Sequence, residues 1–219
     1  KTMENKQHQI ELTTQFVKSF HQNEATGHDW FHINRVNNLA KKISKKEGGD
    51  LFKIELIALL HDVADHKLND GDEKIGLKNV EDFLLSINIE GNLIKDILSN
   101  IENISFKGAE VLQKELSLEG MIVQDADRID AIGAIGIART FAYGGNKNRM
   151  IYDPQSKPEM HTDFGKYKNN TAPTIDHFYE KLLLLKDRLN TSSAKEIAEQ
   201  RHQFMEIFLT QFYKEWNCD

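Results

Sequence analysis

His61 and Asp62 directly follow the apolar run Leu56–Leu60. An imidazole and a carboxylate in a buried segment cost free energy unless they are paired or coordinate an ion. Asp65 follows one helical turn later, so these polar side chains share one side of a helix. A helix end that emerges into solvent explains Asp65, but it explains His61 and Asp62 poorly because the preceding residues are continuously apolar. The pattern indicates a pair of metal ligands.

A second polar group lies in the segment Gly27–Val36. His28 and His32 are four residues apart and Arg35 follows three residues later, so all three share a face if the segment is helical. Histidines that are only packed or exposed are the alternative explanation for this segment taken by itself.

A third group places Asp125, Asp127 and Asp130 within six residues of an otherwise apolar stretch. Without a cation these carboxylates would repel one another and raise each other's pKa. Arg128 offers one counter-charge, which is the plainer explanation, and a metal ion is the other.

Together the groups supply two imidazoles and two carboxylates, from His32, His61, Asp62 and Asp127. This mixed set suits Mn²⁺, Fe²⁺, Co²⁺, Ni²⁺ or Zn²⁺ in a site with open positions for water and substrate. Cationic side chains lie within or close to the same segments, at Arg35, Lys67, Lys107 and Arg128. A metal ion with convergent cations can hydrolyse phosphate esters and anhydrides. The sequence has no P-loop, GxGxxG fingerprint or Ser-centred elbow.

Apolar periodicity predicts an all-α chain. The expected helices cover residues 10–20, 31–46, 50–65, 73–87, 91–103, 118–142, 174–189 and 194–214. Gly48 and Gly49 should end the second helix, Asp50 should cap the third, and residues 190–193 should cap the last. Gly133 and Gly136 should allow close helix–helix contact. Residues 144–172 are polar, hold two of the three prolines (the third is Pro173, just after them), and predict a long surface loop that could cover a site.

The bulk properties predict a single domain over residues 1–219 in the cytoplasm. The net charge is -6 and the pI is near 5.9, so no overall basic field would attract nucleic acid or an anionic membrane. Cys218 is the only cysteine, which excludes an intrachain disulfide and fits a reducing compartment. The apolar stretches are too short to span a bilayer, and residues 1–7 lack the apolar region of a signal peptide.

Three segments, read in order, resemble the HD-domain superfamily of metal-dependent phosphohydrolases. They are GHDWFHINRV (27–36), ALLHDVADHK (58–67) and QDADRIDAIGAIGIARTFAYGG (124–145). They are similar to a bacterial subgroup of small stand-alone HD hydrolases, as are Ile104–Lys107 and Asp176–Leu183. The resemblance runs from about residue 10 to residue 215.

The resemblance implies an HD-domain helical bundle with a metal-binding core at about 25–140, the loop 144–172, and two C-terminal helices at 174–216. It implies one divalent ion held by His32, His61, Asp62 and Asp127, because residues 69–125 lack the extra histidines of two-metal members. Mn²⁺ is the favoured ion, with Mg²⁺, Co²⁺, Ni²⁺, Fe²⁺ or Zn²⁺ as alternatives. Asp65 would orient or deprotonate the attacking water, and His28 could donate to a phosphate or leaving oxygen.

The implied substrate is a nucleotide or a small phosphorylated metabolite, with cleavage of a nucleoside triphosphate to monophosphate and pyrophosphate favoured. The expected phosphate-binding residues are Arg35, Lys67, Lys107, Arg128, His177 and Lys181. A 5′-nucleotidase and a non-catalytic nucleotide-sensing HD protein are the two alternatives. Neither a nucleic acid polymer nor a membrane is an expected partner, and a homodimer stays open.

Overall fold

The computed structural model describes residues 3–20, 29–63, 73–104, 115–159 and 171–219, which are largely helical and contain no β-strand. The prediction of an all-α fold is confirmed. The α-helices are α1 (Met3–Phe20), α2 (Trp30–Glu47), α3 (Leu51–Leu60), α4 (Glu73–Ser86), α5 (Gly91–Ile104), α6 (Leu118–Asp130), α7 (Gly133–Asn146), α9 (Asp176–Glu180) and α10 (Ser192–Asn217). A 3₁₀-helix, η2, covers Leu182–Arg188.

The described residues divide into two compact units. The first comprises the residues up to Ile104 together with 115–126, and the second runs onward from Asp127. A single domain over residues 1–219 stays a prediction.

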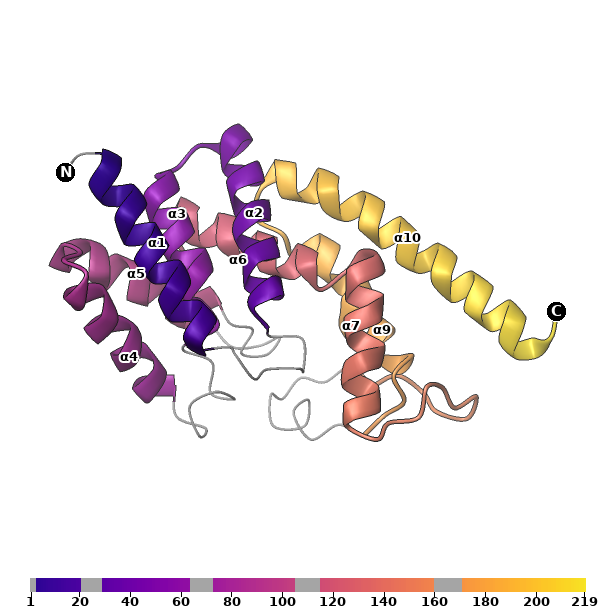
Figure 1. The fold of residues 1–219 in the computed structure, drawn as a ribbon. Coiled ribbons are helices and arrows are strands. Elements are labelled where there is room, and N and C mark those ends of the chain that lie inside the picture. Colours follow the sequence, from indigo (N-terminus) through magenta and orange to yellow (C-terminus); the bar gives the residue numbers. More distant parts are fainter. Residues whose placement is uncertain (1–2, 21–28, 64–72, 105–114, 160–170) are drawn as a thin grey trace. The chain divides into compact units, whose positions relative to one another are not determined.

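Helix α3 forms the centre of the first unit, where it contacts α1, α2 and α5 (Figure 1). Leu56, Ile57 and Leu60 are fully buried, as the apolar sequence of this helix requires. Asp50 caps α3 as predicted, because its carboxylate accepts a hydrogen bond from the backbone N–H of Phe52 at 2.9 Å. The described helix ends at Leu60, five residues before the predicted end.

Helix α2 ends as the paired glycines predict. Gly48 has a φ of 86° and its backbone N–H donates to the carbonyl of Ser44 at 2.8 Å. A glycine takes this conformation at little cost, so it ends the helix and turns the chain toward α3.

The prediction of one helix over residues 118–142 is wrong. Helix α6 ends at Asp130 and α7 starts at Gly133, which has a φ of 77°. Within the second unit, a Cβ at Gly133 would lie 3.0 Å from the side chain of Arg201 on α10. The predicted close approach of helices is therefore confirmed at Gly133, and the same residue also breaks the helix.

The prediction of one helix over residues 174–189 is also wrong. Helix α9 ends at Glu180, and Lys181 leaves helical geometry with φ -141° and ψ -59°. In η2, Leu182 and Leu185 are both buried, and a spacing of three residues matches the 3₁₀ period. The last helix, α10, begins after Thr191, inside the predicted cap segment, although the Thr191 side chain makes no cap hydrogen bond.

The loop between α7 and α9 begins at Lys147, three residues later than the predicted 144–172 segment. Its ends lie together, because Thr174 donates its backbone N–H to the carbonyl of Met150 at 2.8 Å. Residues 160–170 lie outside the described part of the chain. Among the described helices, none combines the length and the apolar character needed to cross a membrane.

Candidate metal centre

His61 directly follows α3, and one of its ring nitrogens makes a hydrogen bond to the backbone. Its Nδ1 lies 2.7 Å from the carbonyl oxygen of Ala58. A carbonyl can only accept a hydrogen bond, so Nδ1 carries the proton and Nε2 keeps its lone pair. A bond of this kind commonly orients a histidine that binds a metal through its other nitrogen.

His32 approaches from the first turn of α2. Asp29 caps that helix by accepting from the backbone N–H of His32 at 2.9 Å. The His32 side chain is buried, and its ring meets that of His61 edge to face at a centroid distance of 5.7 Å. The α2 cap and the α3 terminus thus place two imidazoles against each other.

Asp62 lies between the two imidazoles. One carboxylate oxygen is 3.4 Å from Nε2 of His32, and the other is 3.4 Å from Nε2 of His61. Asp62 is buried, so its charge needs a partner of opposite sign or several hydrogen bonds. Two Nε2 atoms and a buried carboxylate at these distances can surround a cation.

Asp127 completes the group from α6. It directly follows Ala126, the last residue of the first unit, on the same uninterrupted helix. His32, His61 and Asp127 each offer a ligand atom, and these atoms lie within 4.8 Å of one another. The structure therefore brings together three of the four predicted ligands, and the fourth, Asp62, contacts both histidines.

The two other aspartates of the predicted acidic group on α6, Asp125 and Asp130, are not among the candidate metal ligands. Asp130 is buried and its carboxylate accepts from Arg139 at 2.9 Å. Arg128, the counter-charge expected from the sequence, donates to the backbone carbonyl of Arg188. Asp125 is fully buried.

Of the predicted phosphate-binding residues, Arg35 is partly buried on α2, one turn after His32. His177 and Lys181 belong to the second unit. Burial, together with the positive charges of Lys181 and Arg149, lowers the pKa of His177 to about 3. His177 is therefore neutral near pH 7 and can offer a hydrogen bond but no charge. The predicted residues His28, Asp65, Lys67 and Lys107 lie outside the described part of the chain.

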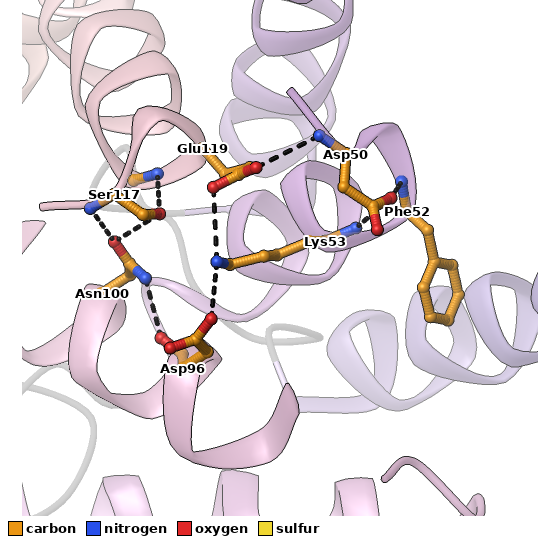
Figure 2. Close-up of polar contacts among 8 residues, drawn as sticks. Asp50, Phe52, Lys53, Asp96, Asn100, Ser117 and Glu119 are labelled. Carbon is orange, nitrogen blue, oxygen red and sulfur yellow. Dashed lines mark hydrogen bonds and ion pairs between the residues drawn. The ribbon is translucent and has the colours of Figure 1, made fainter. Parts of the chain in front are cut away.

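The sequence reasoning missed a polar network near the start of α3, shown in Figure 2. Lys53 is only 8% exposed, and its Nζ lies 2.8 Å from the carboxylate of Asp96 on α5 and 3.3 Å from that of Glu119 on α6. A lysine inside the apolar run Leu51–Leu60 was the available signal, because a buried lysine requires acidic partners.

Glu119 is strongly held in its charged form. Burial would raise its pKa, but this effect is outweighed by hydrogen bonds from its own backbone N–H, the backbone N–H of Asp50 and the Ser117 hydroxyl, and by the charge of Lys53. The net result is a pKa of about 2. Glu119 is thus a carboxylate at every pH at which the protein would normally work.

Comparison with known proteins agrees with this geometry. Residues 30–132 match the HD domain family model. The chain is 41% identical over 209 residues to the uncharacterized protein YpgQ of Bacillus subtilis (strain 168), covering 94% of this chain and 93% of YpgQ. A crystal structure of a HD-superfamily hydrolase from Bacillus thuringiensis matches with a TM-score of 0.78 and 48% identity, over 98% of this chain and 100% of that one. The structure of B. subtilis YpgQ in complex with ADP matches with a TM-score of 0.78 and 36% identity, over 96% of each chain. The chain belongs to the HD superfamily of metal-dependent hydrolases.

Proposed function

We propose that this hydrolase acts on phosphorylated substrates and that it cleaves a nucleoside triphosphate to the monophosphate and pyrophosphate. The observation that carries the proposal is the group of His32, His61 and Asp127, whose donor atoms lie within 4.8 Å of one another, with Asp62 against both imidazoles. Two imidazole nitrogens and carboxylate oxygens fit one divalent ion, and Mn²⁺ is the ion that we propose.

A bound divalent ion would polarise a phosphoryl oxygen and lower the pKa of a coordinated water. The protein's own contribution starts with His61, which the Ala58 carbonyl fixes in the tautomer with a free Nε2 lone pair. Arg35, one turn after His32, would bind a phosphate oxygen. Asp65 is the proposed base that takes the proton of the attacking water, and His28 would donate to a phosphate or leaving oxygen. Lys67 and Lys107 would neutralise the phosphates.

The proposed reaction is a hydrolysis of the bond between the α- and β-phosphates. Water oxygen forms a bond to the α-phosphorus, and the bond from that phosphorus to the bridging oxygen breaks. Pyrophosphate leaves with the bond electrons, and Asp65 takes up the proton. Charge spreads over the phosphoryl oxygens during this step, which is why cationic side chains are needed beside the metal ligands.

The choice of a nucleotide is supported by the relative YpgQ, whose structure was solved with ADP. The acidic net charge of -6 favours a small ligand held by local cations over a nucleic acid polymer. The chemistry also fits the cytoplasm, where nucleotides are abundant and the one cysteine would stay reduced.

The test is a screen of nucleoside mono-, di- and triphosphates with the protein and Mn²⁺, in which pyrophosphate and orthophosphate are measured separately. Pyrophosphate from a triphosphate supports the proposal. Orthophosphate from monophosphates would instead identify a 5′-nucleotidase. Nucleotide binding without any product would identify a non-catalytic sensor. The His61→Ala variant is the control, since its product release should fall to the background rate.

A further inference from the structure

Lys53, in the first turn of α3, and Glu119, in the first turn of α6, join the two helices (Figure 2). The two oxygens of Glu119 contact different parts of α3. One lies 3.3 Å from Nζ of Lys53, and the other accepts from the backbone N–H of Asp50, the α3 cap, at 3.2 Å. A single carboxylate thus fixes both the position and the orientation of the start of α3.

The metal ligands lie at matching positions further along the same two helices. Lys53 precedes His61 by eight residues, and Glu119 precedes Asp127 by eight residues. At a helical rise of 1.5 Å per residue, both separations are about 12 Å. The two helices therefore run in the same direction. The ion pair lies near their starts, and His61 and Asp127 lie about 12 Å further along.

Helix α5 contacts both α3 and α6 near the ion pair. Asn100 accepts from the backbone N–H of Ser117, just before α6, at 3.1 Å and donates to the backbone carbonyl of Asp96 at 2.7 Å. A Cβ at Gly120 would lie 1.9 Å from the Asn100 side-chain oxygen, so a larger residue at this position would displace the Asn100 amide. The carboxylate of Asp96 is itself 65% exposed, in contrast to the 15% of Glu119.

A buried ion pair is a weak source of stability, because desolvation offsets much of its attraction. Its best-attested use is to fix one register between helices. A slip of α3 along α6 by one residue would separate Lys53 from Glu119, and it would move His61 by about 1.5 Å relative to Asp127. That shift is large compared with the tolerance of about 0.2 Å on a metal–ligand bond.

We propose that the Lys53–Glu119 pair is a positioning device for the metal centre: it sets the register of α3 against α6 and so the separation of His61 from Asp127. Lys53 and Glu119 are positioning residues that touch neither the ion nor the substrate. The inference rests on the metal site of the proposed function.

The experiment measures the Mn²⁺ dissociation constant by calorimetric titration of the full chain, and the free energy of unfolding by urea in the presence of EDTA. Glu119→Gln keeps the shape of the side chain and removes its charge, and Lys53 keeps Asp96 as a partner. We expect Mn²⁺ to bind this variant 10- to 100-fold more weakly, the usual range for groups that support metal ligands. Asp96→Asn is the matched control, since it removes an exposed carboxylate from the same lysine, and its Mn²⁺ affinity should stay within about twofold of wild type.

Wild-type affinity in folded Glu119→Gln would overturn the positioning role, whatever its stability, because a merely structural role lowers stability without changing the affinity of the folded protein. An equal loss in Asp96→Asn would also overturn it. If Glu119→Gln does not fold, the variant to measure is Glu119→Asp, which keeps the charge but is one methylene shorter. It should still weaken Mn²⁺ binding several-fold. Unchanged Mn²⁺ affinity in Glu119→Asp would likewise overturn the positioning role. If the wild-type protein binds no divalent ion, the metal centre of the proposed function fails, which is a separate result.

Discussion

The low pKa of Glu119 makes the stability of the protein depend on pH in a defined window. Its folded pKa is about 2 against an ordinary value of 4.5. Because the folded pKa is depressed, the contribution of Glu119 to stability is fully present above pH 4.5 and is lost as the pH falls toward 2. A difference of about 2.5 units corresponds to roughly 3 kcal/mol of free energy of unfolding at neutral pH.

The perturbation that isolates this contribution is Glu119→Gln, which cannot titrate at that position. At about pH 3, where the carboxyl of Glu119 is partly protonated in the unfolded and folded chain to different degrees, its contribution to the free energy of unfolding falls from roughly 3 kcal/mol to about 1.4 kcal/mol. The difference in free energy of unfolding between wild type and variant should therefore shrink by about 2 kcal/mol between pH 7 and pH 3.

The assay is urea unfolding followed by circular dichroism, with both proteins measured at several pH values in EDTA. The subtraction removes the titration of the other carboxylates, which the two proteins share. A difference that stays constant over this pH range would refute the reasoning, because Glu119 would then have an ordinary pKa in the folded protein. If the difference in free energy of unfolding instead grew as the pH fell, the pKa of Glu119 would be raised in the folded protein and not lowered.

Three further predictions concern the metal centre and the helix break. His61→Ala should lose both Mn²⁺ binding and hydrolysis, because it removes a ligand and leaves Asp62 without one of its two imidazoles; calorimetry with a product assay checks this, and full turnover would contradict it. Mn²⁺ at 100 times its dissociation constant should stabilise the wild-type protein by about 2.7 kcal/mol, and EDTA should reverse the gain in a thermal melt. Gly133→Ala should destabilise by about 1–3 kcal/mol because of its φ of 77° and its contact with Arg201, whereas Gly145→Ala on the same helix, with open space around it, should stay within about 0.5 kcal/mol in urea unfolding.

The elements that the sequence predicted well are those whose signals are local. The Asp50 cap and the Gly48 end lie next to the helices they limit, and His61 and Asp62 directly follow the apolar run that makes them conspicuous. The helix break at Gly133 was missed because the side chain that lies against this glycine, Arg201, is 68 residues away in the sequence and gives no local signal.

The polar network was missed for the same reason. Lys53 and Asp96 are 43 residues apart, and no periodic pattern connects them. The sequence predicts which side chains carry chemistry from their types and spacing. It does not predict which distant groups hold the supporting helices in register, because that depends on packing between helices and not within one.

The position of His61 directly after the end of α3, as its C-cap residue, has an electrostatic consequence. The carbonyl groups at the end of a helix carry a partial negative charge equivalent to about half an elementary charge. A cation bound by His61 and Asp62 would lie at this negative end and be favoured by it. A substrate phosphate at the same place would be disfavoured by the same field. Helix α3 would thus select for the metal, and the substrate's charge must be balanced by side chains such as Arg35.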